Sequence, residues 1–369
     1  MSAITSTMNE FRKTPILWLL LLVPVVLVYE SVNPEAHTVL FLLSVAAIIP
    51  LAATLSRATE SVAAKTGDMI GGLLNATLGN LTELFIALAA LRAGQIVLVK
   101  ASIAGAILTN ALFMLGAAFL LGGLKYHVQD FNKTNARFQS AMMFLASVAL
   151  VIPSTIAADG GDMAAAFAAE VSVPIAIILL VTYGLGLIFS LKTHKTLYAS
   201  DHEGAGEGEE HVWPLGVALP VLAAVTVLIA LVSEIFVESV QVASLELGMS
   251  APFVGFVVVA LVGGAAEMTT AFSAARKNRL DLSVSIAMGS ASQIALFIAP
   301  LVVLLSYFIA PAPMDLVLWP GAVLMVMIAT ITATLVTGGG RSAWFVGVLL
   351  LAVYLIFASA LYLMPPQVR

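Results

Sequence analysis

The sequence predicts an all-α polytopic membrane protein with 11 transmembrane helices, arranged as one additional helix followed by two inverted five-helix repeats. Three observations support this prediction: the composition, the length of the apolar segments, and a repeat between the two halves of the chain. Of the 369 residues, 61% are hydrophobic and only 10% are charged. A water-soluble domain carries far more charged residues, so the chain is expected to lie within a lipid bilayer.

The apolar residues are grouped into eleven segments. Most of them contain 20 or more residues, which is the length that an α-helix needs to cross the ~30 Å hydrocarbon core. Strands of a membrane barrel would instead alternate in polarity over about 10 residues. The segments are 14–30, 36–56, 70–93, 96–123, 137–158, 169–191, 213–237, 250–274, 281–309, 315–337 and 342–364.

The positions of the charges predict the orientation. With the N-terminus in the cytoplasm, thirteen of the 16 Lys and Arg residues fall in cytoplasmic loops. The positive-inside rule therefore predicts the N-terminus inside and the C-terminus outside. The outer loops carry acidic residues, which either concentrate cations modestly or form an ordinary solvated face. These residues are Glu30, Glu35, Asp159, Asp162, Glu170, Glu238, Glu246 and Asp315.

A repeat becomes visible when the chain is shifted by 184 residues, without a gap over two segments of each half. The matched pairs are Gly71 and Gly255, Gly79 and Gly263, Glu83 and Glu267, Ala87 and Ala271, Arg92 and Arg276, Gly105 and Gly289, and Phe113 and Phe297. Each repeat has five spans, an odd number, so the second copy is expected to enter the membrane upside down. Inverted repeats of this kind are typical of secondary transporters, which bind their substrates at mid-membrane between the halves.

The repeat divides the chain into four parts. Residues 1–35 form the additional N-terminal helix, 36–192 the first repeat, 193–212 a cytoplasmic linker, and 213–369 the second repeat. The linker contains the acidic sequence SDHEGAGEGEEH. It is interpreted as a solvated flexible segment, with a weak cation-gathering or regulatory role as the alternative.

Two carboxylates fall near the middle of predicted spans, Glu83 in 70–93 and Glu267 in 250–274. An ionised carboxylate at that depth costs at least a few kcal/mol, so a proton, a cation or a partner side chain must neutralise it. On a continuous helix, Asn75 and Gly79 would share one stripe with Glu83. The pseudo-two-fold axis is expected to bring both glutamates to similar depth on facing helices.

Small and polar residues accompany both glutamates. The small residues Gly79, Gly263, Gly264, Gly105 and Gly289 let backbones approach closely and leave carbonyl groups within reach. Further oxygen atoms come from the candidate ligands Asn80, Asn110, Ser292 and Gln293. The sequence therefore predicts a site made of hard oxygen ligands.

The expected ligand of this site is a divalent cation, because two carboxylates match its charge. An oxygen-only set favours Ca²⁺ over Zn²⁺ or Cu⁺, while Mn²⁺ stays an alternative. The chain has no Cys, so thiolate sites are excluded. Without metal, two close and poorly solvated carboxylates repel each other and are expected to take up protons. Ca²⁺ and H⁺ would then compete for the same oxygens, and exchange would be obligatory if only neutralised states switch access.

Two long motifs carry a family resemblance. GGLLNATLGNLTELFIAL with VKASIAGAILTNALFMLG, and GGAAEMTTAFSAARKNRLDLSVSIAMGSASQIALFIAP, resemble the two signature repeats of the cation/proton exchangers of the calcium/cation antiporter superfamily. The resemblance covers the whole chain. It implies a Ca²⁺/H⁺ antiporter that exports calcium from the cytosol by alternating access, with Glu83 and Glu267 as metal-binding and proton-binding residues. The family's first-repeat Asn matches Asn80, and its second-repeat Ser and Gln match Ser292 and Gln293.

The second motif departs from the family's usual GNAAEH pattern, because Gly264 replaces Asn and Met268 replaces His. Affinity, pH dependence or ion choice is expected to differ accordingly. The sodium/calcium exchanger branch usually has Pro just before its acidic residue. Thr82 and Ala266 stand there instead, which favours protons over sodium as the counter-ion.

The resemblance also sets expectations about substrates and partners. The substrates are Ca²⁺ and H⁺, the surroundings are a lipid bilayer, and the protein is a monomer or homo-oligomer that needs no cofactor and binds no nucleic acid. The short N-terminal segment and the lack of an organelle-targeting signal favour the prokaryotic inner (plasma) membrane, with a vacuolar membrane as the alternative. Four alternatives stay open: a Na⁺- or K⁺-coupled Ca²⁺ exchanger, another cation/proton antiporter for Mn²⁺ or Na⁺, a cation channel, and an intramembrane enzyme. The enzyme is the weakest of them, because the chain has neither HExxH nor Cys.

Overall fold

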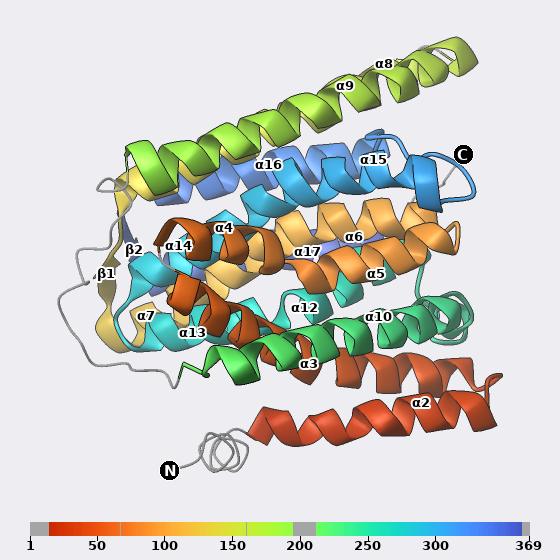
Figure 1. Ribbon diagram of the computed structural model, residues 1–369. Coiled ribbons are helices and arrows are strands. Elements are labelled where there is room, and N and C mark those ends of the chain that lie inside the picture. Colours follow the sequence, from red (N-terminus) through yellow and green to blue (C-terminus); the bar gives the residue numbers. More distant parts are fainter. Residues whose placement is uncertain (1–14, 67, 160, 195–211, 364–369) are drawn as a thin grey trace.

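The computed structural model describes residues 15–66, 68–159, 161–194 and 212–363, and nearly all of this part of the chain is helical (Figure 1). The helices of the first half are η1 (Pro15–Leu21), α2 (Leu22–Val32), α3 (His37–Thr66), α4 (Asp68–Leu78), α5 (Leu81–Arg92), α6 (Ile96–Leu108), η2 (Thr109–Met114), α7 (Leu115–Tyr126), α8 (Lys133–Asp159), α9 (Gly161–Ile188) and η3 (Phe189–Thr193). Those of the second half are α10 (Leu215–Glu246), α11 (Ala251–Phe253), η5 (Val254–Val259), α12 (Ala260–Gly263), α13 (Ala265–Arg276), α14 (Leu280–Gln293), η6 (Ile294–Ile298), α15 (Ala299–Ile309), α16 (Pro320–Thr337) and α17 (Trp344–Leu363). Among them η1 is a 3-10 helix, and η2, η3, η5 and η6 are π-helices.

The helices match the predicted apolar segments closely. Within the described residues, eight helices are long and apolar enough to cross a membrane, or up to ten if each of two bent pairs is one span. The N-terminal apolar helix Trp18–Val32 is shorter than these. Its length of about 22 Å falls below the ~30 Å hydrocarbon core, so the eleventh span stays a prediction.

Both bent pairs occur at the predicted carboxylates, and here the expectation of continuous helices is wrong. Residues 70–78 and 81–92 form two helices that meet at 41°, and residues 254–263 and 265–276 meet at 62°. Gly79 and Gly264 lie at the breaks, where residues without a side chain weaken a helix. The break separates Asn75 and Gly79 from Glu83, so the three do not form one straight stripe.

A short β-ladder interrupts the predicted all-helical fold. Strand β1 (Val128–Asp130) pairs antiparallel with β2 (Arg341–Ala343), with Val128 opposite Ala343. The pairing arises because the connections α7–α8 and α16–α17 lie side by side, so their free backbone groups satisfy each other. Arg341 also bonds Asp130 through Nε at 2.5 Å from Oδ1.

The helices form layers around a common core (Figure 1). Helices α2, α3 and α10 gather on one side, with α3 packed along α10, and α8 with α9 lies on the opposite side beside α16. Helices α6 and η5 cross between them, and α7 packs along α17. Small residues make these crossings close: a Cβ at Gly123 would lie 2.4 Å from the backbone nitrogen of Trp344.

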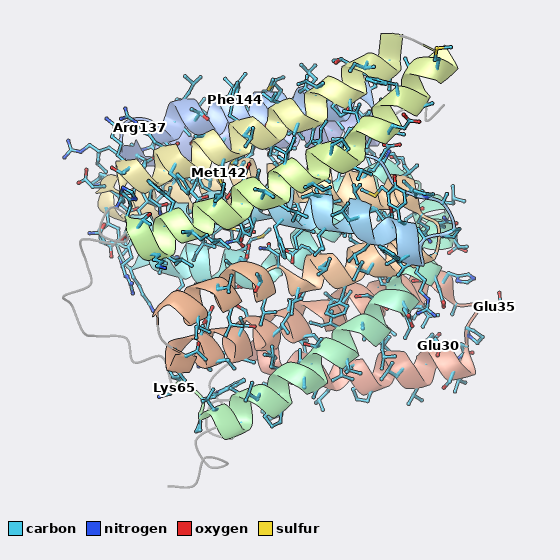
Figure 2. The ribbon with its side chains drawn as sticks, turned by 45° about the horizontal axis from the view of Figure 1, so that its top comes forward. Glu30, Glu35, Lys65, Arg137, Met142 and Phe144 are labelled. Atoms are coloured by element: carbon cyan, nitrogen blue, oxygen red, sulfur yellow. The ribbon has the colours of Figure 1, made fainter. Side chains whose placement is uncertain are left out.

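The two ends of the bundle differ in charge (Figure 2). Lys65 and Arg137 mark one end, which we call the basic end, and Glu30 and Glu35 mark the other, the acidic end. These four residues lie at opposite ends, as the loop charges predicted.

Candidate functional site

The two glutamates occupy equivalent positions in the structure. Glu83 lies in the first turn of α5 and Glu267 in the first turn of α13, each just after its helix break. The partial positive charge of a helix N-terminus stabilises a carboxylate placed there. Each break thus directs a helix N-terminus, together with its glutamate, toward the interior of the protein.

The glutamates also face each other. The Glu83 carboxylate packs against the second break, since a Cβ at Gly263 would lie 3.0 Å from Glu83 Cγ and 3.3 Å from its Oε1. The charges of Glu83 and Glu267 are near enough to repel each other. A side chain at position 263 would therefore crowd the Glu83 carboxylate. The structure therefore brings together the two carboxylates that the repeat singled out.

A chain of buried polar side chains connects the two halves beside the glutamates. Asn110 Nδ2 donates to Ser290 Oγ at 2.8 Å, and Ser290 Oγ donates to Asn80 Oδ1 at 2.9 Å. Asn80 Nδ2 donates in turn to Gln293 Oε1 at 2.6 Å. Ser290 and Glu267 also line the same cavity. Asn80, Asn110 and Ser290 are each at most 3% exposed, so their oxygens are held in place around the glutamates.

Backbone irregularity places two members of this chain. Asn110 lies in the π-helix η2, and Gln293 ends α14 directly before the π-helix η6. The two π-segments occupy equivalent positions of the repeats, because residues 110–114 of η2 correspond to residues 294–298 of η6 under the shift of 184 residues. A π-segment widens the helix locally and is frequent at functional sites. At the first break, Tyr183 of α9 donates to the carbonyl of Ala76 at 2.9 Å and so satisfies a backbone acceptor near the end of α4.

One predicted site residue points elsewhere. Ser292 Oγ bonds Gln139 Oε1 at 2.6 Å and the Gly289 carbonyl at 2.9 Å, so it does not join the chain around Asn80. Ser290 takes that place, because it lies three residues before Gln293 and therefore shares its helix face. This spacing was a usable signal for Ser290. Gln139 carries no such signal, since it is a single polar residue of α8.

The glutamates have an oxygen available for a ligand. Glu267 Oε2 is buried without a hydrogen-bond partner in the described structure. Among the described residues, no group of three or more His, Cys, Asp and Glu gathers to hold a metal. The charged part of the site is therefore the pair of glutamates, and the remaining oxygens around it are neutral. This donor set fits a hard divalent cation that must also be released.

A cavity connects the site to the basic end. It has a volume of about 280 Å³. Its walls are Ser56, Glu60, Asn75, Gly79, Gln139, Glu267, Thr270, Leu282, Ser285, Ile286, Gly289, Ser290 and Gln293. Glu267 and Gly79 belong to the helix breaks, and Glu60 belongs to the part of α3 that runs toward Lys65 at the basic end (Figure 2). Hydrated ions can approach Glu267 along these polar walls.

The equivalent path toward the acidic end is closed. Glu83 lines a cavity of only about 10 Å³ with Ala106 and Val259, which correspond to Ser290 and Asn75 in the open cavity. The closure is a backbone contact, since a Cβ at Gly105 would lie 2.3 Å from the carbonyl oxygen of Phe256. At the equivalent Gly289 the nearest atom, Gln139 Nε2, would be 4.0 Å away. The two repeats thus share a pattern but differ in conformation.

Comparison with known proteins agrees with this architecture. The profile of the family described as sodium/calcium exchanger protein matches residues 36–192 and 217–363. The chain is 38% identical over 366 residues to a Ca²⁺/H⁺ antiporter of Aphanothece halophytica, covering 96% of this chain and 98% of that protein. It is 40% identical over 328 residues to the Ca²⁺/H⁺ antiporter ChaA of Bacillus subtilis, covering 88% and 92%.

A solved structure is similar over the same length. The crystal structure of the Ca²⁺/H⁺ antiporter protein YfkE superposes with a TM-score of 0.80 at 35% identity, covering 95% of this chain and all of that one. The family match and these relatives extend through both repeats and both glutamates. The chain therefore belongs to the sodium/calcium exchanger protein family.

Proposed function

We propose that this protein is a Ca²⁺/H⁺ antiporter of the plasma membrane, which exports calcium from the cytosol in exchange for protons. The observation that carries the proposal is the pair of glutamates at the two helix breaks, of which Glu267 lines the open cavity and has a buried oxygen without a hydrogen-bond partner. The names of the relatives in Aphanothece halophytica and Bacillus subtilis support the same substrates.

The proposed Ca²⁺ site lies between Glu83 and Glu267. Asn80, Gln293 and Asn110 contribute amide oxygens, and Ser290 replaces the sequence-predicted Ser292 as the hydroxyl beside Glu267. Two negative charges neutralise one Ca²⁺ or two protons equally well. The ion that occupies the site therefore excludes the other, and coupling follows from this competition.

The proposed transport step alternates access between the two ends. The open cavity lies between α3 and the rest of the bundle, with Ser56 and Glu60 as its α3 residues. At the acidic end a second cavity of about 220 Å³ lies between α10 and the turn from α5 to α6. Because α3 and α10 pack along each other, a displacement of this pair closes one path and opens the other. Only a neutral site crosses the low-dielectric interior cheaply, so empty ionised glutamates do not cycle.

The orientation follows from charge. The basic end faces the cytosol in this proposal, so the described conformation is open to cytosolic Ca²⁺. Helix α17 then runs from the cytosolic end to the outer end, so the C-terminal side of the chain is outside, and the N-terminus lies inside if Trp18–Val32 crosses the bilayer. The repeats at 36–192 and 213–369 move about the glutamates, whereas the acidic linker 193–212 lies almost entirely outside the described residues.

Flux into proteoliposomes distinguishes the coupling ion. Radioactive Ca²⁺ uptake is expected when a pH gradient is imposed, and no uptake is expected with a Na⁺ gradient at equal pH on both sides. Protein-free liposomes give the background. Uptake that follows the Na⁺ gradient and ignores the pH gradient would contradict proton coupling and select a Na⁺-coupled exchanger.

Ca²⁺ affinity is expected to fall as the pH falls. Protons occupy the empty site at low pH and must leave before Ca²⁺ binds, whereas at high pH the site is already free and affinity reaches a plateau. At pH values below this plateau, each further drop of one pH unit raises the apparent Kd for Ca²⁺ about tenfold for each proton displaced. Equilibrium binding of radioactive Ca²⁺ to the purified protein over a pH series measures this slope. A Kd that stays constant from acidic to alkaline pH would contradict competition.

Position 264 is expected to tune the affinity. Gly264 is the repeat equivalent of Asn80, so the second half lacks one amide. A Cβ there would lie 3.3 Å from the Met268 methyl group and 3.5 Å from Asn110 Oδ1, a tight but adjustable fit. Gly264→Asn is expected to lower the apparent Kd for Ca²⁺ by about tenfold, the value of one charge-assisted ligand. Gly264→Ala is the control, because it adds only the Cβ; equal affinities of the two variants would contradict a role for the amide.

A further inference from the structure

The turn between α5 and α6 is tied to α10 at the acidic end by two side chains. Arg92 Nη1 bonds Glu234 Oε1 at 2.9 Å, and Gln95 Nε2 donates to the Val237 carbonyl at 2.8 Å. Both bonds connect the α5–α6 turn, which follows the helix that carries Glu83, to α10, which packs along α3. In Figure 1 the α5–α6 turn and the end of α10 lie at the same side of the bundle.

These bonds border the path that is closed. Gln95 is also part of the wall of the 220 Å³ cavity, together with Leu98, Val240 and Ser244. Their repeat equivalents are Arg279, Leu282, Ser56 and Glu60, and the last three line the open cavity at the basic end. The cavity beside Gln95 is therefore the counterpart of the wide mouth of the open path.

The basic end has no matching ties within the described residues. The repeat equivalents of Arg92 and Gln95 are Arg276 and Arg279, both exposed. Neither side chain makes a hydrogen bond to α3 in the part of the chain that the structure describes, and the position equivalent to Glu234 is Pro50. Arg276 takes part through its backbone, whose carbonyl accepts from Lys125 Nζ at 3.0 Å. The ties are thus a one-sided feature of a two-fold arrangement.

We propose that Arg92 and Gln95 form a latch on α10, through Glu234 and the Val237 carbonyl, that holds the acidic end closed and favours the conformation open at the basic end. They act as positioning residues, since neither touches Glu83 or Glu267 in the described contacts. The inference rests on the proposed alternating access. Opening the acidic end separates α10 from the α5–α6 turn and must break both bonds.

The expected size of the effect follows from the exposure of the bonds. The Arg92 and Glu234 side chains are 74% and 47% exposed, so solvent screens their attraction. Removing such a pair shifts an equilibrium by at most about fivefold, and a neutral hydrogen bond like that of Gln95 has a similar range. Because the ties are separate bonds to one helix, the double variant is expected to shift the equilibrium by roughly the product of the two effects.

Cysteine labelling measures this equilibrium directly, because the chain has no Cys. Ser102 lines the closed cavity beside Glu83 and is 9% exposed, so Ser102→Cys reports opening at the acidic end. Ser285→Cys, in the wall of the open cavity, reports that the fold is intact. The full-length protein is reconstituted into lipid nanodiscs, where a water-soluble maleimide reaches both ends.

In the Ser102→Cys background, Glu234→Gln and Gln95→Ala are each expected to raise the labelling rate by about two- to fivefold. Asp130→Asn is the matched control, since it removes an exposed Arg–carboxylate pair that joins β1 to β2 and does not involve α10. Labelling at Ser285→Cys is expected to continue in every variant.

The latch would be overturned if the Glu234→Gln, Gln95→Ala double variant left the labelling rate of Ser102→Cys unchanged. It would also be overturned if Asp130→Asn raised this rate equally. The readout needs no Ca²⁺ or pH gradient. A failure of Ca²⁺/H⁺ exchange in the flux assay is therefore distinguishable from a failure of the latch.

Discussion

Glu267→Gln is expected to abolish Ca²⁺ uptake driven by a pH gradient, and Glu83→Gln is expected to do the same. Glutamine keeps the shape of the side chain but removes one of the two charges that neutralise Ca²⁺, and it cannot exchange a proton. Losing a residue that only supports a metal ligand typically costs about 10- to 100-fold in affinity, so losing a charged ligand is expected to cost more. The measurement is the initial rate of radioactive Ca²⁺ uptake into proteoliposomes at matched protein density.

Glu238→Gln is the matched control for these variants. Glu238 is an exposed carboxylate of α10, so its loss changes the net charge by the same amount without touching the glutamate pair. Uptake by this variant is expected to stay near that of the unmodified protein. Retained uptake in either Glu83→Gln or Glu267→Gln would contradict a site shared by both glutamates.

Gly105→Val and Gly289→Val are expected to stop transport by opposite routes. At position 105 even a Cβ meets the Phe256 carbonyl oxygen at 2.3 Å, a backbone atom that cannot move aside, so the acidic end cannot close. At position 289 the described conformation has room, but the equivalent closure at the basic end would be blocked. Overpacking of this kind costs about 1–3 kcal/mol, enough to exclude one of two conformations of similar energy.

Accessibility separates the two variants where flux does not. With Ser102→Cys as reporter, Gly105→Val is expected to increase maleimide labelling, and Gly289→Val is expected to leave it at or below the level of the parent protein. Labelling of Ser285→Cys shows that each variant is folded. Equal labelling of Ser102→Cys in both variants would contradict closure through these glycines.

The sequence was sufficient to predict most of the helices and the close approach of Glu83 and Glu267. Long apolar runs predict helices almost independently of tertiary context, because unpaired backbone groups are not tolerated in lipid. Glu83 and Glu267 stand out because the same costly residue recurs at the same offset in both halves. A single such glutamate would have been compatible with an ordinary polar contact between helices.

The local geometry was harder to predict. Gly79 and Gly264 are compatible with a continuous helix, and only the packing of the breaks around Glu83 and Glu267 decides otherwise. Ser290 and Ser292 are two residues apart and point to different faces, so the choice between them depends on the rotation of α14. Gln139 reaches Ser292 only through the tertiary packing of α8.

The asymmetry between the two ends was beyond sequence analysis for a physical reason. The proposed alternating access requires one sequence to adopt at least two conformations of similar energy, so a pattern of repeats cannot say which path is open. The choice depends on small terms such as the bonds of Arg92 and Gln95 to α10. These residues carry no motif, and the side chains of their counterparts Arg276 and Arg279 make no hydrogen bond to α3 within the described residues.

Proton release on Ca²⁺ binding tests the shared site most directly. The purified protein in weakly buffered solution, with a pH indicator, is titrated with Ca²⁺ at a pH where the empty site is protonated. Competition for the two glutamates predicts the release of as many as two protons per Ca²⁺, and none from the Glu83→Gln, Glu267→Gln double variant. If the unmodified protein binds Ca²⁺ saturably but releases no protons at any pH tested, including the pH at which the empty site is expected to be protonated, the shared site is contradicted.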